Sequence, residues 1–180
     1  MKVVVLYGSP RKKGTTAQLV SAFCDALPKD AEIQIFSPYD NPVNPCCGCG
    51  LCEQGWYCAY DDMDEVMEAM IECDLLVIAS PVYYLTFPAP LKAVLDRTQR
   101  CFNAHRQERS PFHFKERDTI VLLAAGAPSE RGDVVREQLR WLLPPLNAHM
   151  KGIVVCANTD KEIDHDAIEY AAELGSRVGR

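Results

Sequence analysis

The 180-residue sequence has no apolar run long enough to cross a membrane as a helix, and its only basic cluster is Arg11 to Lys13. A membrane-spanning helix needs about 20 consecutive apolar residues. A nucleic-acid-binding surface needs clustered Lys and Arg, whereas this chain carries a formal net charge of -6. The sequence therefore predicts neither a membrane protein nor a nucleic-acid-binding protein.

A secretion signal is also missing, because the N-terminal apolar run is too short for a signal peptide and no small-residue cleavage site follows it. We therefore expect a cytoplasmic protein, in which nine cysteines indicate metal binding, redox chemistry or buried thiols rather than disulfides. The four histidines show neither metal-ligand nor catalytic-triad spacing. With 48% hydrophobic and 24% charged residues, the composition predicts a single globular domain over residues 1–180.

Apolar runs typical of buried parallel strands alternate with segments of helical period. Strands are predicted at residues 2–7, 33–36, 75–79, 119–124 and 153–156, and helices at 16–27, 62–73, 90–101, 133–143 and 164–177. The long pieces without a periodic pattern are residues 38–60 and 102–117. Five such strand-helix units predict an α/β protein with a doubly wound sheet and right-handed crossovers.

Ligands of doubly wound sheets bind beyond the carboxyl ends of the strands, where the strand order reverses. The loop after the first strand runs from Gly8 to Thr16, combines glycine, hydroxyl and cationic residues, and leads directly into a helix. Unpaired N–H groups at a helix start favour a phosphate. The glycine spacing fits neither the dinucleotide fingerprint nor the nucleoside triphosphate loop. A mononucleotide phosphate such as that of FMN is the predicted ligand.

Two further loops complete this edge. Residues 80–88, after the third strand, combine prolines with aromatic and apolar side chains on which a flat heteroaromatic ring could lie. Residues 125–128, after the fourth strand, are small enough to let a ligand touch the backbone.

Three motifs occur in order along the chain: GSPRKKGTT, then PCCGCGLC, then SPVYY followed by PLKAVLDR. In these motifs the chain resembles the NAD(P)H-dependent FMN reductase group of flavodoxin-like proteins, whose cysteine-bearing branch includes the iron-sulfur flavoproteins. The resemblance spans nearly the whole chain. It implies a flavodoxin-like, doubly wound five-stranded parallel sheet of order 2-1-3-4-5 with helices on both faces. It also implies FMN on the three loops and a homodimer or homotetramer.

Carried over by position, the resemblance assigns the FMN phosphate to Ser9, Arg11, Thr15 and Thr16. It assigns the isoalloxazine ring to Pro81, Val82, Tyr83, Tyr84 and Leu85. Gly126 and Ala127 would complete the pocket. Many relatives carry an asparagine where this chain has Thr15, and the hydroxyl keeps a hydrogen-bond donor there.

Five of the nine cysteines crowd one segment, in which Cys46, Cys49, Cys52 and Cys58 supply four thiolates. The spacing of the first three lets one loop hold three corners of a [4Fe-4S] cluster, which matches the iron-sulfur flavoprotein pattern. Adjacent Cys47 cannot be distinguished from a spare thiol. Three interpretations stay open, namely a cluster, unligated structural or redox thiols, and a zinc site.

The sequence thus predicts an FMN-dependent oxidoreductase that passes electrons from NADH or NADPH through FMN to a quinone, a flavin or another acceptor. The cofactor carries the difficult chemistry, and no side chain is required as an acid or base. Two rival hypotheses belong to other classes. One is an electron carrier in which a [4Fe-4S] cluster relays electrons to a partner protein, and the other is a flavin-binding regulatory module without turnover.

Overall fold

The computed structural model describes residues 1–107, 114–128 and 132–178 of the chain. The strands are β1 (Lys2–Tyr7), β2 (Glu32–Phe36), β3 (Leu75–Pro81), β4 (Arg117–Ala124) and β5 (Ala148–Cys156). The α-helices are α1 (Thr15–Asp25), α2 (Leu51–Gln54), α3 (Asp64–Glu72), α4 (Ala89–Arg97), α5 (Gln99–Gln107), α6 (Asp133–Leu142) and α7 (His165–Arg177). A 3-10 turn, η1 (Pro144–Leu146), precedes β5.

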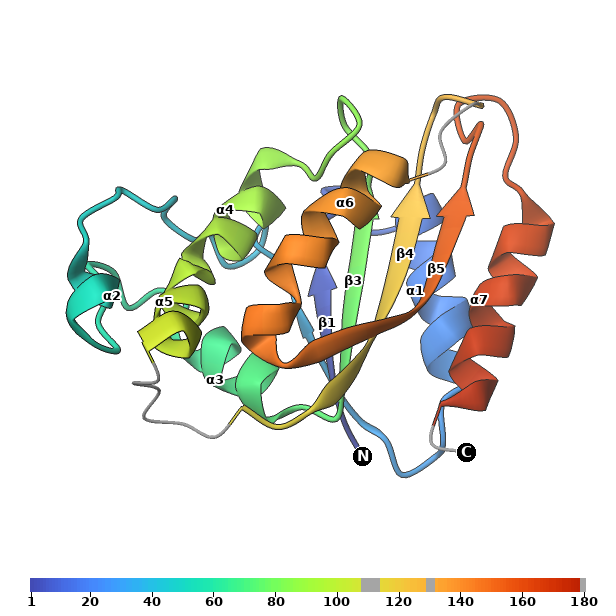
Figure 1. The fold of residues 1–180 in the computed structure, drawn as a ribbon. Helices are drawn as coiled ribbons and strands as arrows, with labels where there is room; N and C mark the ends of the chain where they lie inside the picture. The colour runs from blue at the N-terminus through green and yellow to red at the C-terminus, as the bar shows by residue number, and fades with distance from the viewer. Residues whose placement is uncertain (108–113, 129–131, 179–180) are drawn as a thin grey trace.

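All five strands are parallel and lie in the order β2-β1-β3-β4-β5 (Figure 1). The central strands are apolar on both faces, and residues 75–80 of β3 are buried throughout. Such strands need helices on both sides of the sheet to cover them. The predicted flavodoxin-like sheet is therefore confirmed.

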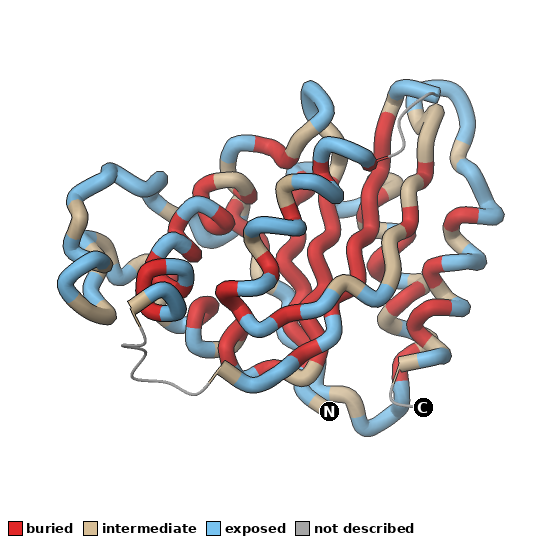
Figure 2. Tube along the Cα trace, in the orientation of Figure 1, coloured by how far each residue is buried: buried red, intermediate tan, exposed pale blue. Residues whose placement is uncertain are grey.

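The helices form one layer on each face of the sheet. Helices α3, α4 and α6 pack on one face, where Met67, Leu91 and Leu139 belong to one buried cluster. Helices α1 and α7 pack on the other, through Phe23 and Ala171 among others. Figure 2 shows the buried trace concentrated in the strands and the inner sides of these helices. None of the helices within the described ranges is long and apolar enough to cross a membrane.

The predicted helix over residues 90–101 is two helices, and the prediction that residues 102–117 lack periodic structure is wrong up to Gln107. The break falls at Thr98, whose Oγ1 donates to Leu95 O at 2.7 Å. A threonine hydroxyl that bonds a helix carbonyl competes with the backbone ladder. The chain then forms a second helix, α5, whose Asn103 and Gln107 bond Cys52 and Glu53 of the cysteine segment.

Strand β5 begins at Ala148 rather than at residue 153. This strand lies at the sheet edge, so His149 and Lys151 are exposed and interrupt the apolar run that sequence analysis relied on. The register also shifts between Thr119 and Ile120 of β4, opposite this stretch. An edge strand with one open side does not need a continuous apolar pattern.

Candidate functional site

Three loops leave the carboxyl edge of the sheet side by side. Gly8 N donates to Ala79 O at 2.7 Å, and Val82 N donates to Ala124 O at 2.8 Å. These bonds extend the β1–β3 and β3–β4 pairings past the strands. The phosphate loop (residues 8–14), the hairpin loop (residues 82–88) and the third loop (residues 125–128) therefore share one edge.

The phosphate loop is held as a compact turn by its own residues. Tyr7 Oη donates to Arg11 O at 2.7 Å, and Arg11 N donates to Ser9 Oγ at 3.2 Å. Gly14 N also donates to Arg11 O, at 3.3 Å. Ser9 is buried, while the Arg11 side chain is exposed to solvent. The turn thus fixes the backbone of the phosphate loop and leaves the Arg11 side chain exposed.

Helix α1 starts at the end of this turn with Gly14 as its N-cap, and no side chain among the described residues caps its first turn. Thr16 is buried at the helix start, and Thr15 is half-buried. A helix start with uncapped N–H groups, hydroxyls and nearby cations has the chemistry of an anion site. The four predicted phosphate ligands lie together in this turn and the first turn of α1.

The hairpin loop reverses the chain at Tyr84 and Leu85. Tyr83 N donates to Thr86 O at 2.9 Å, and Thr86 N donates to Tyr83 O at 3.1 Å. Tyr84 and Leu85 have φ values of 49° and 68°. A two-residue hairpin with two positive φ angles normally uses Asn-Gly, so two bulky residues here carry backbone strain. Strain of this kind concentrates at binding sites.

The strained turn is braced from the opposite side. Gln138 Nε2 on α6 lies 2.7 Å from Thr86 Oγ1, and Thr86 Oγ1 lies 3.0 Å from Gln138 Oε1. Pro81 and Val82 are half-buried at the base of the loop, whereas Tyr84 is fully exposed at its tip. The structure therefore places the five predicted ring contacts at different depths, with Tyr84 turned to solvent.

Sequence analysis overlooked the loop after β2. Lys12 Nζ and Asp40 Oδ1 form an ion pair of 2.7 Å that ties this loop to the phosphate loop. Burial raises the pKa of Tyr39, and the neighbouring Tyr83 adds to the increase. Tyr39 and Tyr83 are thus close enough to interact electrostatically. The implied 2-1-3-4-5 order was a sufficient signal, since it puts the end of β2 next to the end of β1.

The third loop is held by the strand beside it. Ala125 N donates to Cys156 O at 2.8 Å, and Thr159 N donates to Ala125 O at 3.0 Å. A methyl group on Gly126 would lie 2.2 Å from Asp160 Oδ2. The Asp160 carboxylate therefore lies directly against Gly126, while Ala127 is exposed at the same edge.

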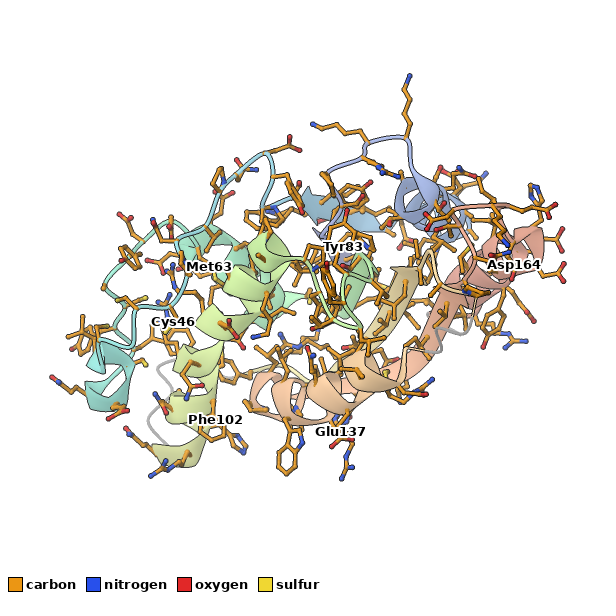
Figure 3. The ribbon with its side chains drawn as sticks, turned by 90° about the horizontal axis from the view of Figure 1, so that it is seen from above. Cys46, Met63, Tyr83, Phe102, Glu137 and Asp164 are labelled. Atoms are coloured by element: carbon orange, nitrogen blue, oxygen red, sulfur yellow. The ribbon has the colours of Figure 1, made fainter. Side chains whose placement is uncertain are left out.

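The cysteine loop (residues 44–60) lies away from this edge, against α4 and α5. In Figure 3, Cys46 and Tyr83 are on opposite sides of α4. Gly48 and Gly50 have φ values of 66° and 74°, which let the chain turn between successive cysteines. A cavity of about 100 Å³ is lined by the predicted ligands, by Cys47, and by polar residues of α4 and α5.

Hydrogen-bond donors face the sulfurs of this loop. Asn103 Nδ2 donates to Cys52 Sγ at 3.1 Å. The hydrogen bond from Leu51 N–H lowers the pKa of the Cys49 thiol, and that from Ala59 N–H contributes to the decrease. N–H donors to thiolate sulfur are a recognised feature of iron-sulfur loops.

The donor set of the cysteine loop fits an iron-sulfur cluster in chemistry and in number. All four predicted thiolates line the same cavity. Within the described residues, however, no three His, Cys, Asp or Glu side chains are gathered in metal-ligating geometry. The loop therefore carries the ligands without holding them converged on one point, and this applies equally to a cluster and to a zinc ion.

Comparison with known proteins identifies the family to which this chain belongs. The sequence matches the NADPH-dependent FMN reductase family over residues 1–161. An iron-sulfur flavoprotein of Archaeoglobus fulgidus is 30% identical over 182 residues, which cover 99% of this chain and 79% of that protein. An iron-sulfur flavoprotein of Methanocaldococcus jannaschii is 38% identical over 101 residues. That match covers 55% of this chain and only 52% of the relative.

A solved structure shows the same fold over the full length. An NAD(P)H:quinone oxidoreductase of Methanothermobacter marburgensis superposes with a TM-score of 0.75 at 21% identity, covering 100% of this chain and 98% of that one. The fold and its loop edge define a flavodoxin-like protein. The chain belongs to the NADPH-dependent FMN reductase family.

Proposed function

We propose that this protein is an FMN-dependent NAD(P)H oxidoreductase. The observation that carries the proposal is the convergence of three loops on one sheet edge, at the uncapped start of α1. FMN, when bound there, supplies the chemistry by accepting a hydride from a reduced nicotinamide and passing electrons to a second substrate.

The residues of this chain supply binding and orientation. In this proposal the phosphate is held by the hydroxyl donors of Ser9, Thr15 and Thr16 and by the exposed cation of Arg11. Pro81 and Val82 form the wall nearest the sheet, and Tyr83 with Leu85 extends it toward solvent. The small third loop, with Gly126 and Ala127, leaves room at the other side of the pocket.

The acceptor is proposed to be a quinone, a flavin or a similar electron acceptor that enters the slot the nicotinamide has left. The quinone oxidoreductase of the same fold supports this choice. The open, strained hairpin loop leaves such a slot accessible from solvent, because Tyr84 and Leu85 point outward. From the resemblance to the FMN reductase group, we propose a homodimer or homotetramer.

The test is anaerobic reduction of the FMN-loaded protein. NADH or NADPH should bleach the flavin absorbance, and an added quinone or ferricyanide should restore it. Parallel lines in a two-substrate kinetic plot would support alternate occupation of one slot. Failure of both nicotinamides to bleach bound FMN would refute the oxidoreductase proposal.

A second candidate is an electron carrier with a [4Fe-4S] cluster on the cysteine loop. Two observations favour it: the thiol-lined cavity with N–H donors to sulfur, and the iron-sulfur flavoproteins among the relatives. Cys46, Cys49, Cys52 and Cys58 would hold the cluster, which would supply one-electron transfer. Protein purified anaerobically and analysed for flavin, iron and acid-labile sulfide decides between this candidate and free thiols.

A further inference from the structure

The cysteine loop closes on one buried arginine at the end of α4. Arg97 Nη1 donates to Asn44 O at 2.9 Å, and Arg97 Nη2 donates to Tyr60 O at 2.9 Å. Asn44 precedes Cys46 by two positions, and Tyr60 follows Cys58 by two positions. A single guanidinium therefore joins the backbone on both sides of the cysteine segment.

Arg97 is itself held firmly in place. Its side chain is 2% exposed, and Nη1 lies 2.7 Å from Asp62 Oδ1. Asp62 Oδ2 accepts from the backbone N and the side-chain Nδ2 of Asn44 at 2.8 and 2.7 Å. The guanidinium carbon lies 5.4 Å from the centre of the Tyr60 ring. This planar fork serves several acceptors at once, which a lysine ammonium on a flexible stem cannot reproduce.

Helix α5 holds the cysteine loop at its middle. Asn103 donates to the sulfur of Cys52, and Gln107 Nε2 donates to Glu53 O at 2.9 Å. Asn103 and Gln107 are four residues apart on α5, so they share one side of that helix. The loop is thus fastened at both ends and at its centre.

Two donors in this region are unused. The Nε atoms of Arg97 and Arg100 are buried and have no hydrogen-bond partner in the described part of the chain. Both arginines line the cavity that the five thiols surround. A buried N–H without an acceptor is costly, and negatively charged sulfur is a suitable acceptor.

We propose that Arg97 is the positioning residue of the cysteine loop. It ties the two ends of the loop together so that Cys46 and Cys58 face one cavity, and with Arg100 it offers free Nε–H donors to the sulfur ligands held there. The statement that these sulfur ligands belong to a cluster rests on the proposed iron-sulfur site. The closure of the loop by Arg97 does not depend on that proposal.

The first experiment measures loop closure in protein that cannot assemble a four-thiolate cluster. Cys24, Cys47, Cys49 and Cys52 are replaced by serine, which leaves Cys46 and Cys58 as the only thiols outside the buried ones. Dibromobimane, which fluoresces when it bridges two thiols, should then link Cys46 to Cys58 rapidly. Mass spectrometry of the bridged peptides identifies the pair.

Arg97→Lys in this background keeps the positive charge but cannot bond both loop ends. Bridging should slow by at least about tenfold, the effect of losing one or two hydrogen bonds from a charged group. Arg140→Lys makes the same change at an exposed site on α6 and should leave the rate unchanged. Equal rates in Arg97→Lys and its parent, or no bridging with Arg97 intact, would overturn the proposal.

A second measurement covers the case in which Arg97→Lys does not fold, as judged by circular dichroism and FMN binding. Nitroxide labels on Cys46 and Cys58, with Arg97 intact, should give one narrow distance distribution by pulsed electron paramagnetic resonance. A broad distribution would show an open loop and would overturn the proposal.

Iron analysis of the otherwise unchanged chain separates this inference from the iron-sulfur proposal. After anaerobic reconstitution, wild-type protein should hold iron and Arg97→Lys should lose most of it while keeping FMN. Equal iron in both proteins would overturn the role of Arg97 and leave the cluster in place. Absence of iron in both would remove the cluster, and the bridging rates alone would then decide the role of Arg97.

Discussion

Gly8 and Leu91 meet where the phosphate loop passes over the first turns of α4. A Cβ atom on Gly8 would lie 2.4 Å from Leu91 Cδ2 and 3.0 Å from Leu91 Cβ. Leu91 is fully buried, so it has little room to retreat. The backbone of the phosphate loop can therefore reach its position only without a side chain at residue 8.

Gly8→Ala should lower the free energy of unfolding by about 1 to 3 kcal/mol, the usual cost of overpacking a core. Thermal unfolding followed by circular dichroism measures the change. In a Leu91→Ala background the added methyl group has space, so Gly8→Ala should cost less there than in the wild type. Additive effects of the two substitutions would show that the two side chains do not compete for space.

Ser9→Ala combined with Thr16→Ala should release FMN on dialysis. In the proposed site each substitution removes a hydrogen bond to the charged phosphate, worth roughly 1.5 to 3 kcal/mol. Ser21→Ala is the matched control, because Ser21 lies on the same helix α1 but donates to Asp25 at the exposed side. FMN held as tightly by the double variant as by the control would show that the phosphate binds elsewhere.

Thr86→Val should weaken FMN binding without unfolding the protein. The substitution keeps the shape of residue 86 and removes its hydrogen bond to Gln138, so the strained hairpin loop loses its brace. A hydrogen bond of this type contributes about 0.5 to 1.5 kcal/mol, which predicts a loss of several-fold in affinity by fluorescence titration. Glu137→Gln, an exposed change one position away on α6, should have no effect.

Cys52→Ser should abolish iron binding while FMN stays bound, since the cysteine loop and the phosphate loop lie on different parts of the fold. Wild-type protein prepared anaerobically with iron should show about four irons per chain and broad visible absorbance beneath the flavin bands. Cys47→Ser should change little. Flavin-replete wild-type protein without iron or sulfide would leave the cysteine loop as a wall of free thiols.

Stability should fall as the pH rises above about 9. Burial raises the pKa of the Cys101 thiol from an ordinary value of 9.0 to about 12. Between these values the folded thiol keeps its proton while the unfolded thiol loses it, so the folded state binds more protons and is destabilised by rising pH. Urea unfolding between pH 7 and 10.5 measures the slope. Cys101→Ala should flatten it, by on the order of 1 kcal/mol per pH unit.

The periodicity of apolar residues along the sequence was sufficient to predict most of the strands and helices. Strand β1 was predicted with its observed ends, and α1 within two residues of them, because strand and helix periods are written in consecutive residues. The three loops of the ligand edge followed from the same alternation of strands and helices. Prediction was poorest over residues 90–107. The apolar period there predicted one helix, but the Thr98 hydroxyl bonds Leu95 O and the segment forms two helices.

By itself, then, the sequence determined the α/β class, the doubly wound sheet and the loops that carry the proposed FMN contacts. Only the tertiary structure decided that Arg97 bonds the backbone at Asn44 and at Tyr60, which lie 53 and 37 positions before it. The physical reason is that a strand or helix is specified by its neighbours in the chain. A side chain's partners across a loop are chosen by packing in space, which no spacing along the sequence encodes.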